Sequence, residues 1–290
     1  MLVAGANLAL DRVARTDTLR PGEVQHFRSV EARPGGKGVN VCRAARILGQ
    51  PATLFVLAPG ETGRAVVKLL RAEGIALHAL DCPGEVRVAS IILEDSGRVT
   101  VLNEPGPPLD AATWRSFESA VASALEPEQV FVLTGSLPPG APLDAYVRLV
   151  ERARGRAKTV IVDSTGDLLA AALAARPDLV TPNLDEAASV VGRGLRPLEA
   201  ARRLVELGAR NAAVTAGEHG VALAGEAGEA EIQAPRVVVV NPIGAGDCLV
   251  AAVALRLERG EPLRAALEYG VAVAAASVEH AIPGVLERLP

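Results

Sequence analysis

The chain has 290 residues, of which 49% are apolar and only seven are aromatic. Its core must therefore be built from Ala, Val and Leu, which is typical of helices packed on a mainly parallel sheet. The net charge of −4 provides no basic surface for a nucleic acid. No apolar run reaches the length of a membrane-spanning helix, so the sequence argues against both nucleic-acid and membrane partners.

The N-terminal segment "MLVAGANLAL" lacks a basic leader and soon reaches Asp11 and Arg12. It predicts a first strand and not a signal peptide. The three cysteines, Cys42, Cys82 and Cys248, are far apart and form no CxxC pair. This usage fits a reducing compartment better than a disulfide framework, so we expect a cytoplasmic protein.

Residues 33–50, "RPGGKGVNVCRAARILGQ", predict a Gly-rich entry into a helix that Gly49 ends. Its apolar positions recur at helical spacing: Val41, Ala44, Ala45 and Leu48. Arg43 and Arg46 fall on the opposite face of this predicted helix, away from the apolar positions. Lys37 is followed by Gly38 and not by Ser or Thr, so the segment is not a Walker A loop.

Lys37 is unusual because the chain has twenty-seven Arg and only three Lys. A compact point charge for a phosphate or a hydroxyl would explain a Lys at this position. A surface Lys in a turn would explain it equally well.

Two stretches of the first hundred residues intermix polar and apolar side chains, "GEVQHFRSVEAR" (22–33) and "EVRVASIILEDSGRVTVLNEPG" (85–106). The second contains a hairpin-like turn, "EDSGR". These patterns indicate exposed antiparallel strands and not βα units. We expect residues of about 9–34 and 84–104 to form a small sheet that projects from a single domain spanning 1–290.

From residue 110 onward, strand-like runs alternate with helix-like runs, which predicts βα units with a parallel sheet. The strand-like runs are 129–135, 159–166, 179–183 and 211–217. Each ends in Gly, Ser, Thr, Asn or Asp. Ligands bind at the carboxyl ends of strands in open parallel sheets, so we expect the site along that edge.

The segment "NPIGAGDCLVAAV" (241–253) follows "RVVVVN" (236–241), which we interpret as a buried strand, and leads into an apolar helix ended by Gly260. Gly244, Ala245 and Gly246 then lie at a helix N-terminus, where unpaired amides can bind a phosphate. Asp247 in the first turn could act as a base beside that anion. It could also simply offset the helix dipole.

These two Gly-rich segments and four intervening blocks resemble the ribokinase-like sugar kinases, specifically their phosphofructokinase B branch. The blocks occur in the family's order: "NEPGP", "LTGSLPPG", "VDSTG" and "TPNLDEA". The resemblance covers essentially the whole chain and favours the 1-phosphofructokinase and tagatose-6-phosphate kinase subgroup. It implies an α/β fold, a three-layer α/β/α sandwich with a mainly parallel sheet and a small β-sheet lid, and a homodimer formed through the lids.

The resemblance also implies ATP and Mg²⁺ as cofactors. It makes Asp247 the catalytic base and Gly244, Ala245 and Gly246 the anion pocket for the transferred phosphoryl group. Asn183 and Glu186 in "NLDE" resemble the pair that helps to hold Mg²⁺ through water, although Glu186 could be an ordinary helix N-terminal acid. Four residues resemble nucleotide-binding positions beside Asn183, although a Gly-rich turn is as often only a turn: Thr215, Gly217, Gly220 and Gly246.

For the acceptor, Asp11 resembles the carboxylate that holds sugar hydroxyls, with Gly36, Lys37 and Asn40 in the same pocket. Arg87 and Ser136 resemble positions that meet the phosphate of a phosphosugar. An Arg in an otherwise apolar strand is costly unless it is paired, so a bound phosphate is a natural partner for Arg87. An ion pair with a lid carboxylate is the alternative.

The chain departs from the family pattern at three places. Residues 7–11 read N-L-A-L-D where the family usually has N-P-A-L-D, Thr181 replaces the usual Lys, and Asn241-Pro242 replaces a commoner Thr or Val pair. We expect phosphoryl transfer from ATP to a ketohexose monophosphate, with fructose 1-phosphate as the first candidate substrate. Tagatose-6-phosphate kinase and 6-phosphofructokinase are alternatives, as are a kinase of an unphosphorylated sugar or nucleoside and a non-catalytic sugar-phosphate sensor.

Overall fold

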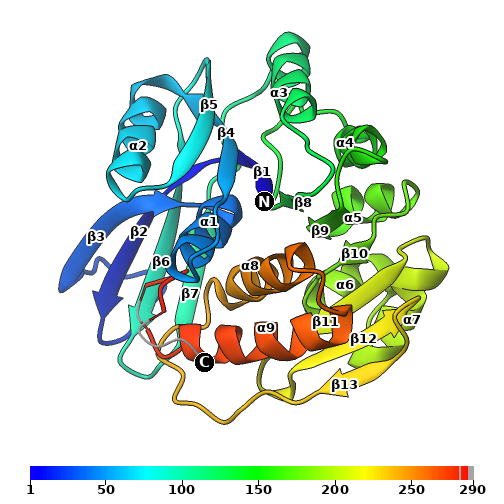
Figure 1. Ribbon diagram of the computed structural model, residues 1–290. Coiled ribbons are helices and arrows are strands. Elements are labelled where there is room, and N and C mark those ends of the chain that lie inside the picture. Colours follow the sequence, from blue (N-terminus) through cyan, green and yellow to red (C-terminus); the bar gives the residue numbers. More distant parts are fainter. Residues whose placement is uncertain (281, 287–290) are drawn as a thin grey trace.

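The main sheet of the computed structural model contains nine strands among the described residues, 1–280 and 282–286 (Figure 1). Their order is β13-β12-β11-β10-β9-β8-β1-β4-β5, and all neighbours are parallel except those involving β12. The strands are β1 (Leu2–Asn7), β4 (Thr53–Pro59), β5 (Ala76–Cys82), β8 (Val130–Thr134), β9 (Thr159–Asp163), β10 (Leu179–Val180), β11 (Asn211–Thr215), β12 (Val221–Gly225) and β13 (Ala230–Ile232).

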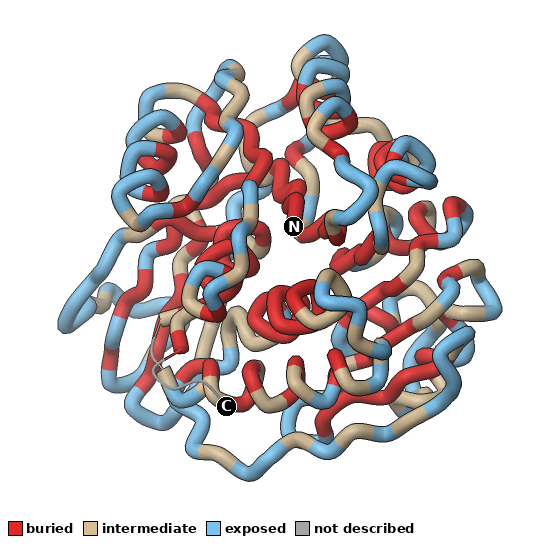
Figure 2. The backbone as a smooth tube through the Cα atoms, viewed as in Figure 1, coloured by how far each residue is buried: buried red, intermediate tan, exposed pale blue. Residues whose placement is uncertain are grey.

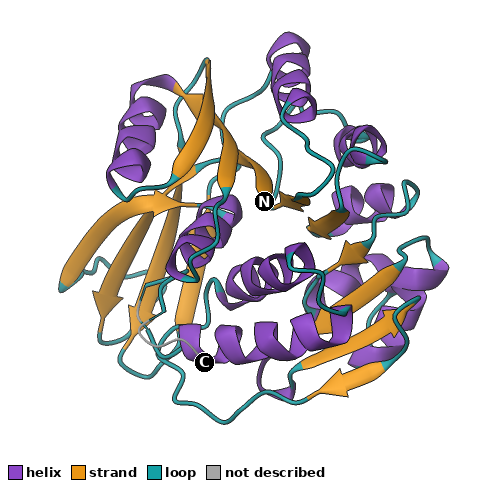
Figure 3. Cartoon of the chain, in the orientation of Figure 1, coloured by secondary structure: helices purple, strands orange, loops and turns teal. Residues whose placement is uncertain are grey.

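Helices cover both faces of this sheet (Figure 3). One layer contains α1 (Lys37–Ile47), α2 (Gly60–Ala72), α8 (Ala245–Glu258) and α9 (Leu263–Ser277). The other contains α3 (Ala111–Ser123), α4 (Ala145–Ala153), α5 (Gly166–Leu173), α6 (Leu184–Val191) and α7 (Pro197–Glu206). Successive strand residues point to opposite layers, so Val132 packs with the first and Phe131 with the second. The predicted three-layer α/β/α fold is confirmed.

A second sheet of four strands, in the order β3-β2-β6-β7, lies at one side of the main body. Its strands are β2 (Ala9–Thr16), β3 (Ser29–Gly35), β6 (Arg87–Glu94) and β7 (Val99–Asn103). The hairpin predicted at "EDSGR" joins β6 and β7. Val13, Ile91 and Leu93 form a small apolar cluster on this sheet, against which Ile243 of the main body packs. We call this second sheet the lid.

Helix α8 is buried over most of its length, as are the central strands (Figure 2). Its neighbour α9 approaches closely at Gly270, where a Cβ would come within 2.9 Å of Val253. Gly260, with a φ of 80°, follows the end of α8 as predicted. No helix in the described part of the chain is both long and apolar enough to cross a membrane.

Three expectations from the sequence are wrong. Residues 236–241 form no strand, and Val238, Val239 and Val240 are exposed. The lid is not wholly antiparallel as expected, because its two central strands β2 and β6 pair in parallel. Arg43 is only 3% exposed, because α8 and residues near Pro283 cover the side of α1 that we placed opposite its apolar face.

Candidate active site

A cavity of about 1770 Å³ lies at the carboxyl ends of the central strands, between the main body and the lid. The strand order reverses here, because β4 lies on one side of β1 and β8 on the other. Such a reversal is the usual ligand site of an open α/β sheet. Every residue to which the sequence assigned a role lines this cavity: Asp11, Gly36, Lys37, Asn40, Arg87, Ser136, Asn183, Glu186, Thr215, Gly217, Gly220, Gly244, Ala245, Gly246 and Asp247.

The N-terminus of α8 presents backbone amides to the cavity. Its N-cap, Gly244, adopts a left-handed conformation with a φ of 85° and supplies no side-chain cap. A Cβ there would come within 3.0 Å of Pro283, so both the conformation and the close approach require glycine. Within the described part of the chain, no heavy atom outside the helix backbone and the chain neighbours lies within 4 Å of a Cβ built at Gly246. This open helix end is suited to bind an anion.

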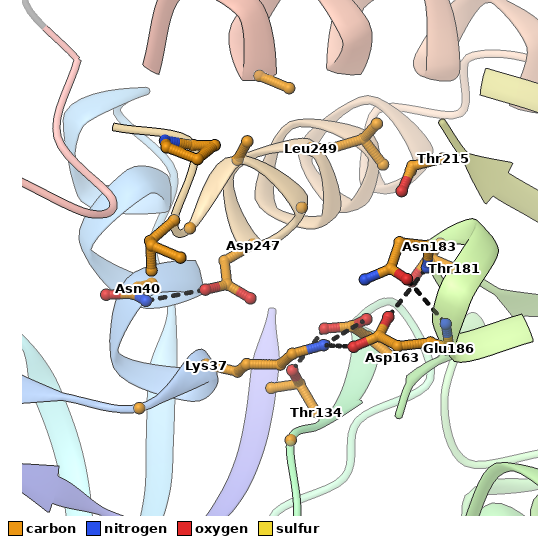
Figure 4. Close-up of a pocket in the computed structure, with 18 of the residues that line it drawn as sticks. Lys37, Asn40, Thr134, Asp163, Thr181, Asn183, Glu186, Thr215, Asp247 and Leu249 are labelled. Carbon is orange, nitrogen blue, oxygen red and sulfur yellow. Dashed lines mark hydrogen bonds and ion pairs between the residues drawn. The ribbon is translucent and has the colours of Figure 1, made fainter. Parts of the chain in front are cut away.

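Asp247 lies in the first turn of α8, is 5% exposed, and accepts a hydrogen bond from Asn40 Nδ2 at 2.8 Å (Figure 4). Burial raises the pKa of Asp247 to about 7, opposed by the nearby Lys37 ammonium and reinforced by the charge of Asp163. A carboxylate with a pKa in this range can accept a proton at neutral pH. An acid that served only to offset the helix dipole would gain nothing from this burial.

Lys37 Nζ lies between two carboxylates, 3.2 Å from Asp163 Oδ1 and 3.0 Å from Glu186 Oε1 (Figure 4). Burial lowers the pKa of Lys37, but Asp163, Asp247 and Glu186 together raise it above its usual value. Lys37 is therefore a fixed cation. The surface-turn alternative for Lys37 is excluded by these contacts.

Asn183 and Glu186 form a reciprocal capping box at the start of α6. Asn183 Oδ1 accepts from the Glu186 amide at 2.8 Å, and Glu186 Oε2 accepts from the Asn183 amide at 2.9 Å. The other oxygen of Glu186 contacts Lys37 in the cavity. Glu186 is thus both a helix N-terminal acid and a charged group of the site.

The turn after β11 forms another wall of the cavity, with Thr215 at the end of the strand and a single 3₁₀ turn over Gly217–His219. Gly220, with a φ of 82°, lies so close to Ile232 that any Cβ would clash with its carbonyl oxygen. Thr181 is buried nearby, and its hydroxyl has no hydrogen-bond partner among the described residues. A ligand in the cavity can supply that partner.

Asp11 and Arg87 face the cavity from neighbouring lid strands. Burial raises the pKa of Asp11 to about 6, and the charge of Arg87 opposes this rise. Arg87 donates to the Asn7 carbonyl at 3.3 Å and contacts Asn103 Oδ1 at 3.5 Å. Within the described residues it forms no ion pair with a carboxylate, so the alternative that we considered for Arg87 is not realised.

Ser136 lies in the loop after β8, and its Oγ accepts a hydrogen bond from Asn7 Nδ2 at 3.0 Å. Asn7 therefore joins the end of β1 to this loop. Ser136 itself is exposed and lines the cavity.

Sequence reasoning missed the roles of Asp163, Thr134 and Arg43. Asp163 ends β9 and accepts a hydrogen bond from Thr134 Oγ1 at 2.9 Å, in addition to its contact with Lys37. A signal for Asp163 was present, since an acidic residue ends a buried strand at the edge where ligands bind. Arg43 gave no such signal, because Glu73 and Pro283, two of its partners, come from distant segments.

The cavity can hold two ligands and combines a buried carboxylate with an open helix N-terminus. Such a site can remove a proton from a hydroxyl and neutralise a transferring phosphoryl group. No cluster of three or more His, Cys, Asp or Glu side chains suited to a metal occurs among residues 1–280 and 282–286. Mg²⁺ commonly binds through one or two carboxylates together with substrate phosphates and waters, a mode that fits Glu186 acting through water beside Lys37.

Comparisons with known proteins agree with this chemistry. The chain is 31% identical over 276 residues to the ATP-dependent 6-phosphofructokinase isozyme 2 of Escherichia coli (strain K12), covering 93% of this chain and 89% of that protein. It is 30% identical over 286 residues to the 1-phosphofructokinase of the same strain, and the match covers 97% of this chain and 92% of that protein.

The fold matches the crystal structure of phosphofructokinase-2 from Escherichia coli in complex with fructose-6-phosphate. The TM-score is 0.88 at 29% identity, over 96% of this chain and 93% of that one. Residues 2–285 match the pattern described as "pfkB family carbohydrate kinase". The chain therefore belongs to the pfkB family of carbohydrate kinases and is an ATP-dependent phosphotransferase.

Proposed function

We propose that this kinase transfers the γ-phosphoryl group of ATP to a free hydroxymethyl group of a ketohexose monophosphate, with fructose 1-phosphate as the first candidate. The surroundings of Arg87 are the observation that supports a phosphorylated acceptor. The Arg87 guanidinium faces the cavity from the lid and, among the described residues, hydrogen-bonds a carbonyl and an amide oxygen, while the Asp11 and Glu104 carboxylates act on it without forming an ion pair. A phosphate on the sugar would supply the direct ion pair that no carboxylate of the described residues forms with Arg87.

In the proposed reaction, the acceptor hydroxyl gives its proton to Asp247 while its oxygen forms a bond to the γ-phosphorus and the bond to ADP breaks. The hydrogen bond from Asn40 orients the Asp247 carboxylate toward the cavity. A positioned base contributes on the order of 10² to 10⁴ in rate. Asp247 gives up the proton to solvent after the products leave.

The amides at the N-terminus of α8 would stabilise the transferring phosphoryl group. Gly244, Ala245 and Gly246 would form this pocket, with open space in front of Gly246 among the described residues and with the Ala245 amide exchanging its 3.4 Å bond to the Pro242 carbonyl for the phosphoryl group. Donors aimed at developing charge contribute several kcal/mol to catalysis of this kind, on the order of 3 kcal/mol for a single donor. Lys37 holds the two neighbouring carboxylates and limits their repulsion of the phosphates.

We place the nucleotide along the wall formed by the turn after β11, with Thr215, Gly217 and Gly220 against it. Glu186, with Asn183 beside it, would hold Mg²⁺ through water, because its Oε1 faces the cavity and is an oxygen ligand. When bound, this ion would neutralise charge on the ATP phosphates. Where the family usually has a Lys, Thr181 offers a hydroxyl for which the described residues provide no hydrogen-bond partner.

On the lid, Asp11 would accept hydrogen bonds from sugar hydroxyls, and Gly36, Lys37 and Asn40 would line the same subsite. Ser136 and Arg87 would contact the acceptor phosphate from opposite sides. A sugar or nucleoside without a phosphate would supply no ion pair to Arg87. A non-catalytic sensor would have no use for a buried base beside open amides.

6-Phosphofructokinase is the second candidate, because the two relatives differ by one percentage point of identity and one of the matched structures contains fructose-6-phosphate. A panel of fructose 1-phosphate, fructose 6-phosphate, tagatose 6-phosphate, free sugars and adenosine, followed by ADP release, separates these functions. We expect the highest kcat/KM with fructose 1-phosphate. Greater activity on any unphosphorylated acceptor than on every phosphosugar would refute the acceptor class.

We further propose that the whole chain acts as one catalytic unit and forms a homodimer through its lid. Strand β3 is an edge strand with exposed residues, among them Val30, and Phe27 lies exposed just before it. The three cysteines are free thiols, which suits a cytoplasmic enzyme.

A further inference from the structure

Arg43 is a charged side chain buried in the first helix of the chain, away from both proposed ligand subsites. All five of its N–H donors have acceptors, which is the full capacity of a guanidinium. Nε and Nη2 bond to the two carboxylate oxygens of Glu73 at 2.9 and 3.2 Å. The remaining donors bond to three other groups: Asn40 Oδ1 at 3.3 Å, the Pro34 carbonyl at 3.1 Å and the Pro283 carbonyl at 3.5 Å.

The contact with Asn40 determines which end of that side-chain amide faces Asp247. A guanidinium only donates, so the oxygen of the amide must face Arg43. The Nδ2 group of Asn40 is then directed at Asp247 Oδ2, 2.8 Å away. If the amide turned over, its oxygen would face the carboxylate and the hydrogen bond to the ionised form would be lost.

Arg43 also joins two segments that frame the anion pocket. Pro34 precedes Gly35 and Gly36, which lead into α1. Pro283 packs against Gly244, since a Cβ built at Gly244 would lie 3.0 Å from it. Glu73, at the C-cap of α2, holds the guanidinium from the other side with the bidentate geometry that only Arg provides. One side chain therefore connects α1, α2 and both segments.

We propose that Arg43 is a positioning residue for catalysis: held by Glu73, it fixes the orientation of Asn40 so that Asn40 donates to Asp247, and it fixes the two segments beside the α8 N-terminus. This inference rests on the proposed role of Asp247 as the base. Arg43 contacts no substrate and acts only through Asn40 and the backbone. A lysine at this position would keep the charge but provide three donors and no planar fork.

The test is a double-mutant cycle with Arg43→Lys, Asn40→Ala and the combined variant. Each single change should lower kcat by about 10- to 100-fold, since small misplacements of reacting groups cost this much. Arg43→Lys should lower kcat less in the Asn40→Ala background than in the wild type, because the part of its effect that passes through Asn40 is already lost and only the part that passes through the Pro34 and Pro283 carbonyls remains. Independent losses that multiply in the combined variant would overturn the proposal.

A pH profile supplies a second readout that a purely structural role would not change. In Arg43→Lys, the pH midpoint of kcat should move upward by about one unit, because the ionised form of Asp247 loses a hydrogen bond. Lys37 from α1, Asp163 from β9 and Glu186 from α6 also face Asp247 and remain unchanged. An unshifted midpoint would contradict the proposal.

Arg46 provides the matched control, because it lies one turn further along α1 and is exposed. Arg46→Lys should leave kcat and the pH midpoint unchanged. If Arg43→Lys fails to fold, as its thermal melting will reveal, Glu73→Gln loosens the same guanidinium and should lower kcat with the same upward shift. Normal kcat and midpoint in a folded Glu73→Gln enzyme would then refute the proposal.

The variant Asp247→Asn separates this inference from the proposed function. If Asp247→Asn keeps its turnover, the base assignment fails whatever Arg43 does. If Asp247→Asn is inactive but Arg43 and Asn40 show no coupling, only the positioning role fails.

Discussion

Asp11 occupies the space where a side chain at Gly35 would stand, since a Cβ built at Gly35 lies 1.9 Å from Asp11 Oδ1. The two residues lie on the paired strands β2 and β3, at the base of the lid. Glycine at position 35 therefore allows the Asp11 carboxylate to lie where it faces the cavity.

Gly35→Ala should displace the Asp11 carboxylate and raise the KM for the phosphosugar by about tenfold, with little change in the KM for ATP. This loss is roughly what one or two sugar hydrogen bonds contribute. Steady-state kinetics with each substrate varied in turn measures it. In an Asp11→Ala background the same Gly35→Ala change should have almost no further effect, and a second full loss there would contradict this relationship.

Asp247→Asn should lower kcat by at least about a hundredfold with a modest change in KM, because an amide cannot accept the acceptor proton. The substitution removes a buried charge but keeps the shape of the side chain, so the melting temperature should not fall. Single-turnover measurement of ADP formation reports the chemical step directly. Near-normal turnover would remove Asp247 from the role of base.

The pH dependence of kcat should follow the ionisation of Asp247. Burial raises the pKa of this carboxyl to about 7, although Lys37 opposes the shift. A base works only when it is deprotonated, so kcat should increase with pH through about 7 and then reach a plateau. A kcat that is flat from pH 5 to pH 8 would indicate another base or a rate-limiting step other than proton removal.

Local sequence pattern predicted the parallel sheet, the small lid sheet and the α8 N-terminus, and the family resemblance supplied the three-layer sandwich. The local pattern failed at 236–241, where a run of valines has the composition of a strand but no neighbouring strand to pair with; the Val240 amide bonds to the Val278 carbonyl instead. It also failed at Arg43, because helical spacing cannot show that another helix and a distant segment cover both sides of α1. What the sequence could not supply was the identity of non-local neighbours.

Arg87→Ala should raise the KM for the phosphosugar by about 10- to 100-fold and leave the KM for ATP nearly unchanged, since a charged hydrogen bond contributes about 1.5 to 3 kcal/mol. Arg12 is the matched control, because it lies on the adjacent strand β2 and is exposed. Arg12→Ala should change neither KM. Equal losses for both substrates in Arg87→Ala would show that Arg87 only supports the lid structure.

Val30→Asp should convert the proposed lid dimer into monomers. Val30 is 44% exposed on the edge strand β3, and an unpaired edge with apolar side chains favours association with a second copy. A carboxylate buried at that contact without a partner would weaken it strongly. Sedimentation equilibrium measures the change in mass, and Leu207→Asp, at a similarly exposed apolar residue just after α7, is the control that should leave the mass unchanged. A wild-type monomer, or a dimer that Val30→Asp does not affect, would rule out this interface.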